Sequence, residues 1–235
     1  MAEPTLDEMI RTWDSETNGV PPEESTLAAR LQILIYRALA EGEPVSAERV
    51  ARDAGVPAEL VNAVFEEGKT RGGEWDDAGR LVGEGLTLAP TRHRFSVSGR
   101  ALYAWCALDA MHLPGLLGET AQVESSDPIS GEAIRLTIPP EGAPTFDPPE
   151  TVLTIVLSQG NRTGPDSPLC EAMQFFATGE TAAQWARGHP DVTVMTVDAA
   201  ARLVSEHIHA PLAGVLAQLD RADDDGNKVM LEGTL

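Results

Sequence analysis

The chain of 235 residues is 42% hydrophobic and carries 37 acidic against 17 basic side chains, a formal net charge of −20. This length and apolar content predict a globular protein with one substantial core or two modest domains. Nucleic acid and anionic lipid are disfavoured as partners, because such an acidic surface repels both. The N-terminus is acidic where a secretory signal would be basic and then apolar, and no apolar run approaches the roughly 18 residues that span a bilayer. We therefore expect a cytoplasmic protein with no membrane partner.

The acidity has two interpretations. Lysine is almost absent, with only Lys69 and Lys228, whereas arginine is retained. A protein from a salt-rich cytoplasm tends to show such a surface, because screening suppresses repulsion between like charges. Ordinary acidity from a GC-rich genome explains the same composition, so both interpretations stay open.

Residues 1–24 are rich in helix-breaking residues and poor in apolar ones, which predicts a flexible acidic arm. Order is expected to begin at Ser25, where apolar residues recur at helical spacing as far as a stop at Gly42. A short helix capped by Ser46 and a second helix starting at Pro57 follow, separated by a turn at Gly55.

Two turns, at residues 77–79 and 89–91, then separate β-prone runs, as in a wing of hairpins. Together with the helices, they predict a winged-helix-like domain over residues 25–97. Its second helix presents Glu59, Glu66 and Glu67 against a single Lys69, whereas a recognition helix needs cations that face phosphates. We therefore expect a scaffolding or substrate-covering role rather than DNA binding.

Residues 98–219 mix strands and helices, and residues 220–235 read as a frayed tail. Residues 99–112 are predicted to be a helix ended by Pro114 and Gly115. Strands are expected in TAQVESS, AIRLTI, TVLTIVL and CEAMQFFA, and helices in TAAQWARG and DAARLVSEHIHAPLAGVLAQL. Segregated runs of this kind predict an α+β fold, in which a mixed, mostly antiparallel sheet domain with helices follows the N-terminal one.

The run YAWCALDAMHL places Cys106 three residues before Asp109. On a helix, residues i and i+3 lie on the same face, so a thiol and a carboxyl could address one bound atom. An apolar setting raises the pKa of a carboxyl, and Asp109 would then be a plausible proton donor. The alternative is structural, since cysteine is among the most often buried residues and a helical aspartate usually faces solvent.

Cys170 is the second of the two cysteines, and it too could be a small buried hydrophobe. If the fold brings it near Cys106, the two thiolates would form a soft site selective for thiophilic metals. His207 and His209 are poor candidates to complete a zinc site, because positions i and i+2 of a helix point apart. A calcium-like loop, DRADDDGNKVMLE, is also weak, because Arg221 stands at its first ligand position.

These residues resemble a known family, the organomercurial (alkylmercury) lyases. The similarity is densest in RALYAWCALDAMHLPGLLGETAQV, returns at CEAMQFFAT and TAAQWARGHPDV, and extends weakly upstream, so that it covers about residues 25–215. The resemblance implies a catalytic trio of Cys106, Asp109 and Cys170, with the two cysteines and the aspartate also contacting the metal. It implies that R–Hg⁺ is captured by thiolate and that Asp109 delivers a proton to the leaving carbon, which gives RH and bound Hg²⁺.

By the same resemblance, organomercurial small molecules are the substrates and no organic cofactor is needed. Hg²⁺ would be handed over to external thiols or to a mercuric reductase. A non-catalytic mercury-binding protein or a metal-responsive regulator is the alternative. The sequence departs from the family in two places. The stretch VESSDPISG lacks a further cysteine that some members have, and residues 139–168 diverge, so no family role is assigned to residues 139–168.

Overall fold

The computed structural model describes residues 22–156 and 164–221. The predicted arm up to residue 21, the tail from residue 222 and most of the calcium-like loop lie outside the described residues. Within them, strands form one antiparallel sheet of eight and one of three, with helices packed around both. The α+β prediction with a mostly antiparallel sheet is therefore confirmed.

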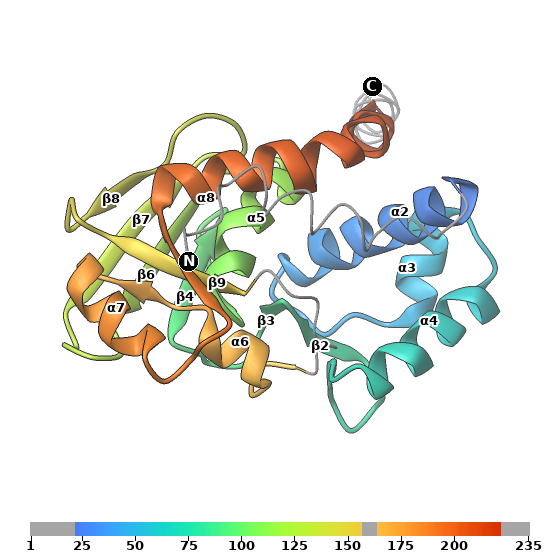
Figure 1. The fold of residues 1–235 in the computed structure, drawn as a ribbon. Helices are drawn as coiled ribbons and strands as arrows, with labels where there is room; N and C mark the ends of the chain where they lie inside the picture. Colours follow the sequence, from blue (N-terminus) through green and yellow to red (C-terminus); the bar gives the residue numbers. More distant parts are fainter. Residues whose placement is uncertain (1–21, 157–163, 222–235) are drawn as a thin grey trace.

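Three helices gather on one side of the molecule (Figure 1): α2 (Pro22–Leu39), α3 (Ala47–Ala54) and α4 (Ala58–Thr70). All three were expected. Ser46 caps α3 by accepting a hydrogen bond from the amide of Arg49, and Gly55 ends it in the left-handed conformation with φ of 67°. The apolar side of α3 packs inward through Val50, which is fully buried. Whether this lobe is a winged helix stays a prediction.

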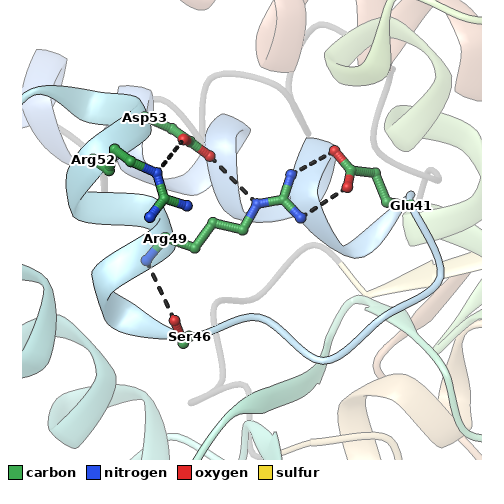
Figure 2. A network of polar contacts seen from close by, with 5 residues as sticks. All are labelled: Glu41, Ser46, Arg49, Arg52 and Asp53. Carbon is green, nitrogen blue, oxygen red and sulfur yellow. Dashed lines mark hydrogen bonds and ion pairs between the residues drawn. The ribbon is translucent and has the colours of Figure 1, made fainter.

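The cations of α3 are engaged by neighbouring carboxylates (Figure 2). Arg49 contacts Glu41 with one nitrogen at 2.8 Å and Asp53 with its Nε at 3.4 Å. Arg52 lies 3.8 Å from the other oxygen of Asp53. Exposed pairs of this kind add little stability. They do leave α3 without a surplus of positive charge.

The large sheet has the order β1-β2-β3-β5-β4-β6-β7-β8. Its first half contains β1 (Glu74–Trp75), β2 (Leu81–Glu84), β3 (Leu86–Thr87), β4 (His93–Val97) and β5 (Arg100–Ala104). Its second half contains β6 (Ala121–Ser126), β7 (Ala133–Ile138) and β8 (Thr145–Asp147). The hairpin strands expected after residue 74 and the strands expected in TAQVESS and AIRLTI are thus confirmed.

The predicted helix over residues 99–112 is wrong in its first half. Residues 100–104 form β5, which pairs with β4 across a tight turn at Ser98 and Gly99. Both turn residues have positive φ, 49° and 73°, the backbone of a two-residue hairpin turn. The helix, α5, starts only at Ala107 and runs through Pro114 to Leu117. The Ser-Gly turn signal therefore outweighed the helix-forming residues around it.

The small sheet has the order β10-β9-β11, and β9 (Val152–Val156) was expected as a strand. The predicted strand CEAMQFFA is wrong in its first half. Residues 168–172 form the short helix α6 (Pro168–Ala172), and only β10 (Phe175–Phe176) is extended. Ser167 caps α6 and Pro168 occupies its first turn, a start signal that explains the helix.

The remaining helices match the expectation closely. α7 (Gly179–Ala186) precedes β11 (Val192–Thr196), and α8 (Val197–Leu203) continues into the π-helical η1 (Val204–His209) and the 3₁₀ turn η2 (Ala210–Leu212). Helical backbone then continues through residues 213–221. The irregular stretch surrounds Pro211, which has no amide hydrogen to donate to the preceding turn. In Figure 1 this long segment lies along α5 on one side of the sheets.

One continuous cluster of buried apolar residues joins the N-terminal helices to the sheets. It includes Leu39, Leu81, Phe95, Leu113 and Leu203. The predicted division into 25–97 and 98–219 falls in the turn between β4 and β5 and stays a prediction. Over residues 22–156 and 164–221, no helix has the length and apolar character to cross a membrane.

Candidate functional site

The segment before α5 is fixed by hydrogen bonds to β1 and to the turn between β2 and β3. Trp105 donates its backbone N–H to the carbonyl of Gly85 at 2.8 Å and its indole Nε1–H to Glu74 at 2.8 Å. The same carboxylate oxygen accepts from the hydroxyl of Thr87 at 2.5 Å. These contacts place the next residue, Cys106, at the N-cap of α5. That end of a helix favours negative charge, because its backbone N–H groups point outward.

Asp109 lies in the first turn of α5 and is fully buried. Cys106 Sγ donates to Asp109 Oδ2 at 3.1 Å, so the predicted juxtaposition of thiol and carboxyl is confirmed. The other oxygen, Oδ1, lies 3.3 Å from Nε2 of His112. The expectation that Asp109 would sit on an apolar helix is met, because nearly all of α5 is buried.

Cys170 is presented by α6, where the hydroxyl of Ser167 accepts its backbone N–H at 3.1 Å. The chain after it is held to β9 by Thr154, whose hydroxyl donates to the carbonyl of Ala172 at 2.7 Å. The amide of Ala107 in turn donates to the carbonyl of Met173 at 3.0 Å. Two segments more than sixty residues apart are thereby brought into direct contact at the N-terminus of α5.

Cys106, Asp109 and Cys170 form one cluster as a result. One ligand atom from each, the two Sγ atoms and a carboxylate oxygen, all lie within 4.8 Å of one another, and all three residues are buried. Neither cysteine takes part in a disulfide. Two sulfurs at this separation can share one soft metal ion, and the adjacent carboxyl can accept or supply a proton.

Three further residues lie at this cluster and were not predicted from the sequence: Gly85, Tyr36 and His112. Gly85 has φ of 77°, and a Cβ there would lie 3.2 Å from Asp109 Oδ1 and 3.3 Å from the hydroxyl of Tyr36. Tyr36 also meets the ring of His112 edge to face, at 6.1 Å between centroids. Tyr36 comes from α2, so the N-terminal lobe contributes to the wall of the site. The histidine in YAWCALDAMHL was the one visible cue.

A second buried histidine, His93, lies close enough to influence Asp109 electrostatically. Burial, reinforced by the nearby charge of Arg92, lowers the pKa of His93 to about 4, although Asp109 and Gln174 act in the opposite direction. His93 Nδ1 lies 2.9 Å from the hydroxyl of Ser125. His93 is therefore neutral near pH 7 and brings no positive charge to the thiols.

The two C-terminal histidines do not complete a metal site. Nε2 of His209 donates to the carbonyl of His112 at 2.8 Å, and its ring packs against Gly115, where a Cβ would lie only 2.1 Å away. His207 lies 3.8 Å from Glu206. Both rings therefore have other partners, and neither belongs to the cluster of potential metal ligands found in the described part of the chain.

Comparisons with known proteins point to one family. The family model described as alkylmercury lyase matches residues 86–208. An alkylmercury lyase of Staphylococcus epidermidis is 38% identical over 169 residues, 72% of this chain and 77% of its own length. The alkylmercury lyase of Pseudomonas putida is 36% identical over 187 residues, which cover 79% of this chain and 84% of that protein. The Bacillus cereus enzyme of the same name is 34% identical over 198 residues, 84% and 88% of the two chains.

Among solved structures, the crystal structure of the mercury-bound form of MerB2 superposes with a TM-score of 0.68. The alignment covers 89% of this chain and 99% of that one, at 22% sequence identity. At this identity the similarity concerns the fold alone, and it supports the mixed arrangement of helices and antiparallel sheets described above.

Proposed function

The chain belongs to the alkylmercury lyase family, and from this premise we propose that it cleaves the carbon–mercury bond of organomercurials by protonolysis. The observation that carries the proposal is the cluster of two thiols, neither of them in a disulfide, and one carboxyl within 4.8 Å. Mercury is the substrate and product here, and no organic cofactor enters the reaction. The catalytic residues we propose are Cys106, Asp109 and Cys170.

The geometry supports a division of labour among the three residues. R–Hg⁺ bonds to Cys106 Sγ, whose proton passes to Asp109 Oδ2, 3.1 Å away. Cys170 Sγ then bonds to the same mercury and releases its proton, and the two sulfurs weaken the bond from mercury to carbon. Asp109 returns its proton to carbon as the electron pair of that bond becomes the new C–H bond. R–Hg⁺ and two thiols thus become RH, a mercury dithiolate and one proton.

Burial of the cluster has a chemical consequence in this proposal. All three residues are inaccessible to water, so the substrate reaches them only through a transient opening of the surrounding segments. Closure then keeps water from the sulfurs and the carboxyl, so the proton on Asp109 is not lost to solvent. A product Hg²⁺ held in this way is removed by competing thiols, either small molecules or the cysteines of a mercuric reductase. The need for reduced thiols favours a cytoplasmic place of action.

The test is hydrocarbon release. Purified protein is incubated with methylmercury or phenylmercury and excess small thiol, and methane or benzene is measured by gas chromatography. We expect catalytic turnover that is absent without protein. Stoichiometric mercury binding without hydrocarbon would contradict the lyase and leave the non-catalytic mercury-binding protein or regulator. A mercury-binding protein has no need of the carboxyl beside Cys106, and this is why the lyase is favoured.

A further inference from the structure

His112 is placed where it can act on the carboxyl of the cluster. It lies one turn after Asp109 on α5, is only 5% exposed, and its Nε2 is 3.3 Å from Asp109 Oδ1. Its carbonyl accepts from His209 and its ring meets Tyr36 edge to face, so both its backbone and its ring are held by neighbours. These contacts hold the side chain beside Asp109.

The ring has only one polar contact within the described part of the chain. Nδ1 of His112 is buried with no hydrogen-bond partner there, whereas Nε2 faces the carboxyl. In neutral imidazole one nitrogen carries the proton and the other is an acceptor. Donation to Asp109 Oδ1 therefore requires the proton on Nε2. An apolar side chain of similar size would fill this place without burying a nitrogen that lacks a hydrogen-bond partner. Packing alone therefore does not explain a histidine at this position, whereas the contact with Asp109 does.

We propose that His112 is a positioning residue, which anchors Oδ1 of Asp109 so that Oδ2 alone faces the thiol of Cys106. A carboxyl held at one oxygen cannot rotate to exchange its two oxygens. The proton taken from Cys106 then stays on the oxygen nearest the reacting atoms, 3.1 Å from the sulfur. This inference rests on the proposed carbon–mercury cleavage and assigns His112 no contact with mercury or with substrate.

The experiment compares two substitutions at one position. His112→Met removes the donor and keeps a side chain of similar length, whereas His112→Gln places an amide N–H at about the position of Nε2. We expect His112→Met to lower kcat by roughly 10- to 100-fold, the usual cost of losing a residue that orients a reacting group. KM and the affinity for Hg²⁺ should change by no more than about twofold, because neither sulfur is touched. His112→Gln should restore most of kcat.

The matched control is His189→Met, which removes a half-buried histidine whose ring stacks on Trp185 and whose Nδ1 contacts the carbonyl of the same residue. Its kcat should equal that of wild type. Unchanged kcat in His112→Met would overturn the inference, as would an equal loss of kcat in His112→Gln accompanied by an equal fall in thermal midpoint, which marks a packing role. If wild type itself released no hydrocarbon while binding Hg²⁺, the proposed function would fail, and the inference with it.

Discussion

The thiol of Cys106 and the carboxyl of Asp109 lie 3.1 Å apart because α5 begins between them, at Ala107, shortly after β5 has ended at Ala104. Cys106 is the last extended residue and Asp109 is the third residue of α5, so their side chains meet across the helix N-terminus. Cys170 approaches the same point from α6. The site therefore depends on two helix starts: α5, whose first amide donates to the carbonyl of Met173, and α6, which is capped by Ser167.

The first prediction concerns the sulfurs. Cys106→Ser and Cys170→Ser should each reduce hydrocarbon release to the uncatalysed level, because a hydroxyl is a hard and poor ligand for mercury. Both cysteines are buried, and serine is only slightly smaller than cysteine. The fold should therefore stay intact and the circular dichroism spectrum should be unchanged. The assay is methane release from methylmercury under excess thiol. Near wild-type turnover in either variant would remove that cysteine from the mechanism.

The second prediction separates proton transfer from mercury binding. Asp109→Asn keeps the size of the side chain but cannot carry a proton to carbon, so release should fall by roughly 10²- to 10⁴-fold, the range for general acid catalysis. Hg²⁺ binding, titrated under a competing thiol, should be largely retained, because it needs only the two sulfurs. Unimpaired release would mean that solvent or a thiol protonates the carbon. Loss of both properties would make Asp109 structural.

Much of the site could be anticipated from sequence because its chemistry lies in a short run of residues. The spacing of Cys106 and Asp109 predicted contact whether or not the residues before them were helical. The approach of Cys170 could not be derived from spacing, since it depends on pairing between β9 and β10 and on the hydrogen bond from Ala107 to Met173. The approach of Cys170 to Cys106 and Asp109 was predicted from the family resemblance and not from periodicity.

The two wrong predictions of secondary structure share one cause. In both, turn and cap signals outweigh the helix-forming or β-forming character of the neighbouring residues. Residues 100–104 contain alanine and leucine, yet the Ser98-Gly99 turn folds them back onto β4. Residues 170–172 precede a Phe-Phe pair and were read as part of its strand, yet Ser167 and Pro168 start a helix there. Contacts such as Tyr36 against His112 could not be predicted, because they join residues 76 positions apart.

The third prediction tests the origin of the acidic surface. If the net charge of −20 is an adaptation to high salt, the thermal midpoint should rise substantially between low and molar concentrations of potassium chloride. Salt shortens the Debye length from about 30 Å at 0.01 M to about 3 Å at 1 M, which relieves repulsion between carboxylates. The measurement is calorimetry across a salt series, with an uncharged osmolyte as control. A thermal midpoint that does not change with salt concentration would leave the ordinary acidity of a GC-rich genome as the explanation of the composition.

The fourth prediction concerns Asp127, which joins the turn after β6 to the start of α7. Its carboxylate accepts from the amides of Ile129, Ser130 and Ala177 and from the hydroxyl of Thr181. Burial alone would raise the pKa of Asp127, but the hydrogen bonds, that of Thr181 foremost, hold it below its ordinary value. Because the folded pKa is the lower one, this stabilisation is present above about pH 4, the pKa of an unfolded aspartate, and is lost as pH falls further.

Asp127→Asn should therefore lower the free energy of unfolding by roughly 2 to 3 kcal/mol at pH 7, the scale of hydrogen bonds to a charged group. The difference between wild type and variant should stay constant down to about pH 5 and shrink below pH 4. Urea unfolding at a series of pH values measures it. Asp53→Asn serves as control, since Asp53 contacts the half-buried Arg49 and the exposed Arg52. A difference that does not shrink in acid would show that the charge on Asp127 is not what stabilises the turn.

The last prediction uses two glycines that differ only in what surrounds them. Gly85 and Gly79 have nearly the same left-handed backbone, with φ of 77° and 75°. A Cβ at Gly79 would meet nothing within 4 Å, whereas one at Gly85 would lie 3.2 Å from Asp109 Oδ1 and 3.3 Å from the hydroxyl of Tyr36. Replacing either glycine by alanine costs about 1 to 2 kcal/mol of backbone strain. Only Gly85→Ala also displaces the carboxyl of the site.

Both variants should therefore lose a similar few degrees of thermal midpoint, while Gly85→Ala alone loses activity. Moving a catalytic group by a few tenths of an ångström to one ångström can cost up to about 10²-fold in rate. Gly79→Ala should retain wild-type kcat at a temperature where both proteins are folded. Equal activities would mean that Asp109 and Tyr36 shift without consequence, and that the 3.1 Å contact with Cys106 tolerates a displaced carboxyl. A kcat loss confined to Gly85→Ala would tie turnover to the position of that carboxyl.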